Sequence, residues 1–258
     1  MVRRDKANYT IQSVSHALDV LEQFTGEPDE LGVTELSKRL KLHKNNVFRL
    51  LATLESRGYI EQNKTTENYR LGVRCLRLGQ RFLLQASLLR QAQPVLNHLA
   101  ETSGETVFIA VLQDDVAVVL DAVEPARAVR LIAKIGDLMP LHCTAVGKAL
   151  LTFSETVLLG EISDYQRYTP ATKCKPNEVR VDLNRASERG YTVELGEHVD
   201  DVCAVAVPIR DYTGTVVAAL CVAGPVHRLP QLRLETEFAE MVLAAGRVLS
   251  ARLGHHTD

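Results

Sequence analysis

The stretch from Thr34 to Tyr59 reads TELSKRLKLHKNNVFRLLATLESRGY, and it decides the fold of the N-terminal part of the chain. Leu36 and Leu40 lie on the inner side of a short helix that Thr34 is expected to cap. A turn over residues 41–43 leads to a second helix that begins at Lys44. The apolar residues of this helix recur every three or four positions, the pattern of one buried stripe: Val47, Leu50, Leu51 and Leu54. The stretch therefore predicts a helix-turn-helix.

The flanking residues extend this motif into a larger one. Residues 13–24 predict an amphipathic helix capped by Ser13, with apolar residues at helical spacing: Val14, Ala17, Leu18, Leu21 and Phe24. Gly58 suits the left-handed conformation that ends many helices, and residues 59–62 and 69–71 predict two short strands around a turn at 63–68. The order helix, helix, turn, helix and hairpin is that of a winged helix-turn-helix, so we expect a DNA-binding domain.

The charge of the chain is unevenly distributed. The 258 residues include 30 Lys and Arg against 32 Asp and Glu, and the net charge of −2, taken as a total, argues against a nucleic-acid binder. Residues 1–74, however, contain 12 basic and 10 acidic residues, and the remainder contains 18 and 22. No acidic residue lies between Glu35 and Glu55, where five cations fall: Lys38, Arg39, Lys41, Lys44 and Arg49. This local excess predicts an anion-binding surface.

The side chains expected to contact DNA are polar or cationic and lie outside the apolar stripes. Guanidinium and amide groups read base edges, and cations and hydroxyls contact phosphates. A hairpin turn can reach the backbone or the minor groove. The expected contacts are Thr34, Lys38, His43, Lys44, Asn45, Asn46, Arg49, Thr53 and, in the hairpin turn, Lys64. The alternative is that the polar face is simply solvated, as on any amphipathic helix.

The rest of the chain predicts a second domain of α+β class, with a mainly antiparallel sheet packed by helices. One or two helices are expected over 73–101, interrupted near Pro94 and ended at Gly104. Helices are also expected at 145–151, 175–189 and 232–253. The expected strands are 106–112, 116–122, 129–132, 191–195, 203–210 and 216–223.

Four segments of the sequence resemble the IclR family of bacterial transcriptional regulators: QSVSHALDVL (12–21), TELSKRL (34–40), NVFRLLATLESRGY (46–59) and YRLG (69–72). The resemblance covers roughly residues 10–253. It implies a winged helix-turn-helix at 1–72, a linker helix at 73–92 and a GAF-like effector-binding domain at 93–258. The function implied is a DNA-binding transcriptional regulator, not an enzyme, whose operator binding responds to a small molecule.

A candidate effector site lies around residues 142–150, HCTAVGKAL. This segment predicts a loop-to-helix junction, whose free N–H groups and helix dipole favour a carboxylate, or alternatively a plain helix start with a surface lysine. The resemblance places the pocket at this loop, at the acidic stretch 194–201 and on the last two strands. When the chain is aligned on Pro208, the family's usual cysteine falls on Ala204. The residues implicated are Leu141, Thr144, Ala145, Val146, Gly147, Glu194, Glu197, Ala204, Cys221 and Ala223.

The effector expected from these residues is less polar than the small oxo-acids that several members of the family sense. The family often has hydroxyl groups where this chain has Cys221 and Ala223, which removes hydrogen-bond donors from the pocket. We therefore expect an aromatic or alkyl carboxylate, or another mostly apolar metabolite, and no cofactor.

The remaining expectations concern partners and location. A single helix-turn-helix reads few bases, so we expect a homodimer on a palindromic DNA operator, and by resemblance a dimer of dimers. Helix 13–24 and the linker helix are the expected dimer surfaces. No run of eighteen apolar residues and no signal peptide is present, so a cytoplasmic protein without membrane contact is expected.

Two other readings use the cysteines and histidines. A thiol-dependent enzyme would need a cysteine paired with a base, and Cys143, Cys203 and Cys221 could in principle supply the thiol beside His142 or His198. A metal- or redox-responsive regulator would use the same residues as ligands. The five cysteines are scattered without a Cys-x-x-Cys pair, which favours reduced thiols and gives neither reading a recognisable spacing.

Overall fold

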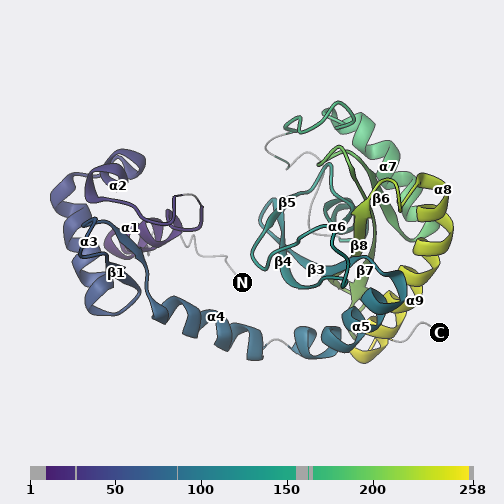
Figure 1. Cartoon of the computed structure of the whole chain (residues 1–258), viewed down its shortest axis with the longest axis horizontal. Helices are drawn as coiled ribbons and strands as arrows, with labels where there is room; N and C mark the ends of the chain where they lie inside the picture. The colour runs from purple at the N-terminus through teal and green to yellow at the C-terminus, as the bar shows by residue number, and fades with distance from the viewer. Residues whose placement is uncertain (1–9, 27, 86, 155–161, 163–164, 256–258) are drawn as a thin grey trace, which may run out of the picture. The chain divides into compact units, whose positions relative to one another are not determined.

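The computed structural model describes residues 10–26, 28–85, 87–154, 162 and 165–255 (Figure 1). The chain divides after Gln85 into two compact units, residues 1–85 and 86–258. The linker helix expected at 73–92 spans this division, and its role as a linker remains a prediction.

The first unit has the expected order of elements. Its helices and strands are α1 (Gln12–Glu22), α2 (Val33–Leu40), α3 (Lys44–Ser56), β1 (Ile60–Gln62), β2 (Tyr69–Leu71) and α4 (Val73–Gln85). The two strands form an antiparallel hairpin. The expected stripe on α3 faces the core, where Val47, Leu51 and Leu54 are buried against Leu36 of α2 and Val20 of α1. These elements confirm the winged helix-turn-helix.

Two helix starts differ from the expectation. α1 begins at Gln12 with Ile11 as its N-terminal cap, and α2 begins at Val33 with Gly32 as its cap, so neither Ser13 nor Thr34 caps a helix. For α2 the cause is Leu31, whose backbone N–H and C=O pair with Tyr69 of β2 at 2.9 Å each. This bridge holds the chain extended up to Leu31 and turns it into the helix immediately afterwards.

The second unit is built on one sheet of six antiparallel strands in the order β5-β4-β3-β8-β7-β6. The strands are β3 (Thr106–Gln113), β4 (Val116–Val123), β5 (Leu138–Pro140), β6 (Thr192–Leu195), β7 (Val202–Arg210) and β8 (Val216–Pro225). The helical segments are α5 (Ser87–Ser103), α6 (Ala145–Phe153), α7 (Pro176–Arg189), α8 (Gln231–Arg233), the π-helical segment η3 (Leu234–Phe238) and α9 (Ala239–Arg252). Mixed α+β class is thus confirmed.

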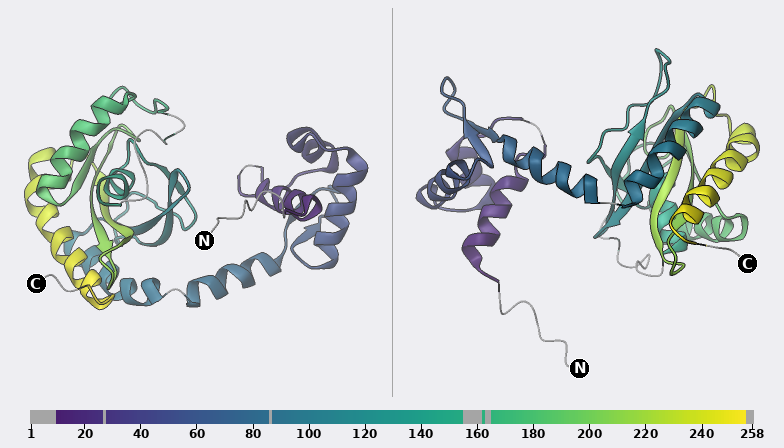
Figure 2. Two further views of the ribbon diagram at one scale, coloured as in Figure 1. Left: turned by 180° about the vertical axis from the view of Figure 1, so that it is seen from behind. Right: turned by 90° about the horizontal axis from the view of Figure 1, so that it is seen from below.

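The sheet curls around α6, while α5 and α9 pack on its other face (Figures 1 and 2). The strands alternate between the two faces, so Ala204 and Ala206 of β7 point toward α6, and Val207 contacts α9 at Gly246. α6 is buried along almost its whole length, from Ala145 to Leu151. The sheet therefore encloses α6 as a central helix.

Two expectations for this unit were wrong in detail. Pro94 lies inside α5 and does not interrupt it, because a proline removes only one hydrogen bond and the buried Leu89, Leu96 and Leu99 hold the helix on the domain. Residues 129–132 form no strand; β5 occupies that edge. Two carbonyls of residues 129–132 accept hydrogen bonds from side chains instead of from a neighbouring strand. The Thr106 hydroxyl donates to the Leu131 carbonyl at 2.6 Å, and the Arg228 guanidinium donates to the Val129 carbonyl at 3.0 Å. The final helix includes the π-helical segment η3.

Gly147 is required by the packing of α6. A Cβ at this position would lie 2.4 Å from Leu141 Cα and 2.6 Å from the Pro140 carbonyl oxygen, both backbone atoms. Gly147→Ala should therefore push α6 from the preceding loop and lower the free energy of unfolding of the second unit by about 1–3 kcal/mol, measured by urea denaturation.

The matched control is Gly79→Ala in α4, where no atom lies within 4 Å of the new methyl group. This substitution should stabilise its helix by up to about 1 kcal/mol. Equal effects of the two substitutions would contradict the close packing inferred for Gly147.

Candidate functional site

The nine side chains expected to contact DNA are all exposed on the first unit. His43 caps α3, and its Nδ1 accepts a hydrogen bond from the Asn45 N–H at 3.3 Å. The Thr53 hydroxyl donates to the Arg49 carbonyl at 2.8 Å, and the Arg49 side chain is exposed. Lys64 lies in the turn between β1 and β2. α3 therefore presents its polar face, with the cations and amides concentrated at its N-terminal half.

Phe48 belongs to the same face, and the sequence interpretation missed it. Its side chain is 57% exposed between Asn45 and Arg49, although an aromatic ring usually contributes to a core. The sequence pattern already indicated this exposure, because position 48 lies outside the buried stripe that contains Val47 and Leu51. Apolar side chains in the major groove contact the methyl group of thymine, so Phe48 is a further candidate for contact with bases.

The second unit contains a cavity of about 190 Å³ beside the N-terminus of α6. Its walls come from α6, from β3, β6, β7 and β8, from the segment 131–139 and from the loop after β6. Seven of the ten residues expected at the effector site line it: Thr144, Ala145, Val146, Glu194, Ala204, Cys221 and Ala223. The residues that sequence reasoning missed are Phe108, Leu131, Ile132, Asp137, Met139, His198, Val199 and Val202.

The strand register explains why these residues meet. Glu194 of β6 pairs with Ala204 of β7, which pairs with Ala223 of β8. In the row two residues along, Cys221 lies between Ala206 and Phe108 of β3. Alternate residues of a strand share a face, so both rows face α6. The small side chains opposite Glu194 leave the space that the cavity occupies.

Glu194 is the central polar group of this cavity. Its side chain is buried, and its two carboxylate oxygens accept hydrogen bonds from the backbone N–H groups of Ala145 (3.2 Å) and His198 (3.3 Å). Burial raises the pKa of Glu194 to about 7, although Lys148 and the N–H of Ala145 act in the opposite direction. The carboxyl group is therefore divided between its neutral and ionised forms near neutral pH.

Two of the N–H groups at the N-terminus of α6, which were expected to hold a ligand carboxylate, are already paired within the protein. The Ala145 N–H donates to Glu194, and the Gly147 N–H donates to the Thr144 hydroxyl at 3.1 Å. Thr144 caps the helix and donates in turn to the Pro140 carbonyl at 2.7 Å. The carboxylate at this helix start is thus the protein's own.

Glu197, Leu141 and Gly147 were expected at the effector site but do not line the cavity. Glu197 Oε1 accepts a 2.6 Å hydrogen bond from Lys148 Nζ, and Lys148 also contacts Asp182 at 3.4 Å. Lys148 is only 1% exposed, so the alternative of a surface lysine is wrong. The reason is charge pairing, because a buried ammonium needs acidic partners, and these two carboxylates supply them.

The three cysteines considered as reactive thiols lack the electrostatics of that role. Burial raises the pKa of Cys143 to about 12, and it also raises the pKa of Cys203 and Cys221. The thiolate is the nucleophile and the metal ligand, so these surroundings disfavour both roles. Within the described part of the chain, no three His, Cys, Asp or Glu side chains come together as a metal site.

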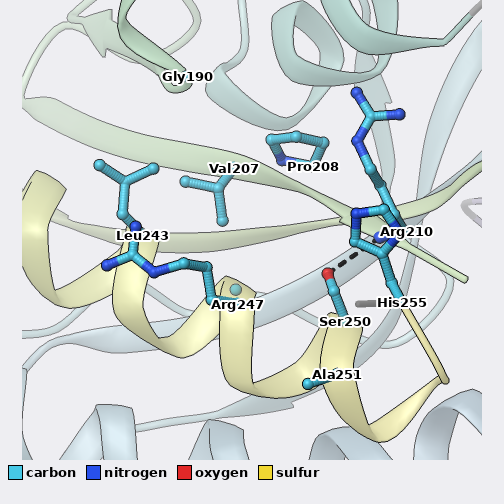
Figure 3. A pocket seen from close by; sticks show the side chains of 10 residues that line it. Gly190, Val207, Pro208, Arg210, Leu243, Arg247, Ser250, Ala251 and His255 are labelled. Atoms are coloured by element: carbon cyan, nitrogen blue, oxygen red, sulfur yellow. Dashed lines mark hydrogen bonds between the residues drawn. The ribbon is translucent and has the colours of Figure 1, made fainter. Parts of the chain in front are cut away.

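A second, larger groove of about 380 Å³ lies between β7 and α9 (Figure 3). Arg210 and Arg247 line it, and the Arg210 N–H donates to the Ser250 hydroxyl at 3.1 Å. It contains none of the residues expected to bind the effector. The Glu194 cavity is therefore the candidate effector site.

Comparisons with known proteins agree with this architecture. Residues 80–251 match the family model described as bacterial transcriptional regulator IclR C-terminal, and residues 13–64 match the IclR helix-turn-helix domain. The HTH-type transcriptional regulator KdgR of Escherichia coli is 32% identical over 255 residues, which are 98% of this chain and 96% of that protein. The transcriptional repressor IclR of Escherichia coli is 30% identical over 249 residues, 95% of this chain and 90% of the repressor.

Solved structures show the same fold. An IclR-type regulator from Silicibacter has a TM-score of 0.84 and 28% identity, covering 95% of this chain and 98% of its own. An IclR homologue from Microbacterium hydrocarbonoxydans, complexed with 4-hydroxybenzoate, has a TM-score of 0.79 and 24% identity over 93% and 98% of the two chains.

A winged helix-turn-helix followed by a separate domain with an internal cavity defines a DNA-binding transcriptional regulator with an effector-binding domain. The chain belongs to the IclR family of bacterial transcriptional regulators. No helix in the described ranges is long and apolar enough to cross a membrane.

The raised pKa of Glu194 predicts that the folded protein becomes less stable as the pH rises. In the unfolded chain this carboxyl group ionises near its ordinary pKa of 4.5, and in the folded protein near 7. The unfolded state therefore loses its proton first, and stability falls as the pH rises from 4.5 to 7. Relative to Glu194→Gln, the free energy of unfolding of the wild type should fall by up to about 3 kcal/mol between pH 4.5 and 8. The measurement is chemical denaturation.

Glu240→Gln on the exposed face of α9 is the control, and its difference from the wild type should not change over this range. A pH-independent difference for Glu194→Gln as well would contradict the buried carboxyl group described here.

Proposed function

We propose that the protein binds a palindromic operator as a homodimer, and that a small molecule in the Glu194 cavity changes this binding. The observation that carries the proposal is the division of α3: Val47, Leu51 and Leu54 are buried, and its cations and amides are exposed. The N-terminal half of the helix enters the major groove, where Asn46 and Arg49 read base edges and Lys44 neutralises a phosphate. Thr34, Lys38 and Lys64 contact the flanking backbone.

The proposed dimer uses exposed apolar side chains of the first unit. Val14 and Leu18 of α1 are each 53% exposed, although the sequence pattern put them on the inner stripe. Val73, Leu76 and Leu78 of α4 are exposed to at least 56%. Large apolar side chains gain free energy when a partner covers them. Two dimers then form the dimer of dimers that family membership suggests.

The proposed effector is mostly apolar, and an aromatic or alkyl carboxylate is the class that we put first. The support is the composition of the cavity wall, to which Phe108, Val146 and Cys221 contribute apolar surface. The homologue from Microbacterium hydrocarbonoxydans has 4-hydroxybenzoate bound, which is an aromatic carboxylate. We propose no cofactor.

Coupling between the two functions is proposed to run through α4 and α5. These helices follow the hairpin and lead directly into β3, so a ligand that shifts the effector domain changes the spacing of two recognition helices in the dimer. Coupling free energies between such sites are typically about 1–3 kcal/mol. The protein acts in the cytoplasm, where its operator is, and it carries out no reaction, which the raised pKa values of its buried thiols support.

Arg49→Ala tests the DNA-binding role. Its operator affinity should fall by about 1–3 kcal/mol, because one base-reading or phosphate contact per subunit is lost. The measurement is fluorescence anisotropy with operators identified by genomic footprinting, at a fixed salt concentration.

Arg57→Ala, at the C-terminal end of the same helix, removes the same charge away from the groove and is the matched control. Equal loss in both folded variants would show that only bulk charge matters and would overturn the proposed reading by α3.

A further inference from the structure

The turn between β1 and β2 is hydrogen-bonded to a residue that is distant in sequence. Asn63 Nδ2 donates to Glu30 Oε1 at 2.8 Å, and the Thr66 hydroxyl donates to Glu30 Oε2 at 2.8 Å, across 33 and 36 positions. Glu30 directly precedes Leu31, whose backbone pairs with Tyr69 of β2 at 2.9 Å. The backbone of Glu30 is therefore anchored beside the hairpin, and each oxygen of its carboxylate accepts a hydrogen bond from the turn.

The two side chains that Glu30 holds also fix the backbone of the turn. Asn63 Oδ1 accepts hydrogen bonds from the N–H groups of Thr65 (2.9 Å) and Thr66 (3.4 Å), the arrangement of an Asx turn. The Thr66 hydroxyl accepts a hydrogen bond from the Asn68 N–H at 3.3 Å. Because an ionised carboxylate only accepts hydrogen bonds, Glu30 keeps the amide nitrogen of Asn63 toward itself and the amide oxygen toward the backbone. Loss of the carboxylate would free this amide to rotate and would loosen the turn.

The charge of Glu30 opposes the binding of DNA. The hydrogen bonds from Asn63 and Thr66 lower the pKa of Glu30, so the group is ionised at neutral pH. It lies beside a turn, residues 63–68, whose one cation is Lys64. A carboxylate repels phosphates, so its electrostatic effect on DNA affinity is unfavourable, whereas its geometric effect is to order the turn. These two effects have opposite signs, which makes them separable by experiment.

We propose that Glu30 is a positioning residue for DNA binding, which holds residues 63–66 in the conformation that presents Lys64 to the phosphate backbone. This inference rests on the proposed function, because it takes Lys64 to be a contact with DNA. Lys64 is exposed and lies between the two residues that Glu30 binds, so the position of its backbone depends on the turn. A turn that is already ordered in the free protein loses less conformational entropy when DNA binds.

The size of the effect follows from the population of the ordered turn. When only a fraction of the free molecules has the conformation that binds, the apparent affinity is reduced by that fraction. Without the hydrogen bonds to Glu30, we expect the ordered turn in roughly a third to a tenth of the molecules, which lowers the affinity about three- to tenfold.

The test is DNA binding by the full chain with Glu30→Gln or Glu30→Asp, measured by fluorescence anisotropy on an operator fragment identified by genomic footprinting. Glutamine is uncharged and accepts through only one of its two terminal atoms, whereas aspartate keeps the charge on a shorter side chain. Both variants should bind about three- to tenfold more weakly than the wild type. Charge repulsion alone predicts tighter binding by Glu30→Gln and no change for Glu30→Asp, and that pattern would overturn the inference.

Glu61→Gln is the matched control. Glu61 lies on β1, and its carboxylate accepts a hydrogen bond from Arg70 of β2 at 2.7 Å, with both side chains exposed. The substitution removes the same charge from the same hairpin at a pair on its strands. Its DNA affinity should equal or exceed that of the wild type. A loss as large as that of Glu30→Gln would contradict a role specific to the turn.

A second substitution tests whether Glu30 acts through Lys64. Lys64→Ala should weaken binding and lower the slope of log affinity against log salt concentration by about one per subunit, because a phosphate contact is lost. The slope should also fall in Glu30→Gln. In the Lys64→Ala background, Glu30→Gln should weaken binding by less than about twofold, because the turn then has no cation to position. An equal loss in both backgrounds would overturn positioning of Lys64.

The wild type distinguishes this inference from the proposed function. Sequence-specific DNA binding by the wild type, with unchanged affinity in both Glu30 variants, would overturn this inference alone. An absence of sequence-specific binding by the wild type would overturn the proposed function, and this inference with it.

Discussion

The structure of the second unit depends on one buried carboxyl group. Glu194 joins three elements that are distant in sequence, because its side chain extends from β6 to the first N–H of α6 and to the loop that carries His198. A carboxylate at a helix N-terminus gains from the helix dipole, whereas burial disfavours its charge. In this protein burial has the larger effect and raises the pKa. The carboxyl group that joins these elements therefore titrates near neutral pH.

The surroundings of Glu194 follow from this constraint. Thr144 accepts a hydrogen bond from the Gly147 N–H of α6, and Thr192 donates to the Ala145 carbonyl at 2.7 Å, which fixes the helix on β6. Gly147 allows the helix to approach the preceding loop closely. Lys148 is buried with its ammonium group paired to Glu197. Each residue positions the start of α6, and none brings a free cation to the cavity.

The first unit was predictable from sequence because its signals are local. The stripe on α3 and the hairpin are each encoded within a few residues, and the structure bears them out. The predicted cap of α2 was wrong because the start of this helix is set by the pairing of Leu31 with Tyr69, which are 38 positions apart. In the second unit the strands were mostly predictable, but the burial of Lys148 and the position of β5 depend on partners distant in sequence. The wall residue Asp137 was missed for the same reason, since its segment has no periodic pattern.

The most direct test of the central claim is carbon-13 NMR of the Glu194 carboxyl group, assigned by comparison with Glu194→Gln and titrated in the folded protein. Its midpoint should lie near pH 7, and the free carboxyl group should respond when a hydroxylated probe such as 4-hydroxybenzoate binds. A midpoint near the ordinary value of 4.5, with a signal that does not respond to the probe, would contradict the buried carboxyl group described for this cavity.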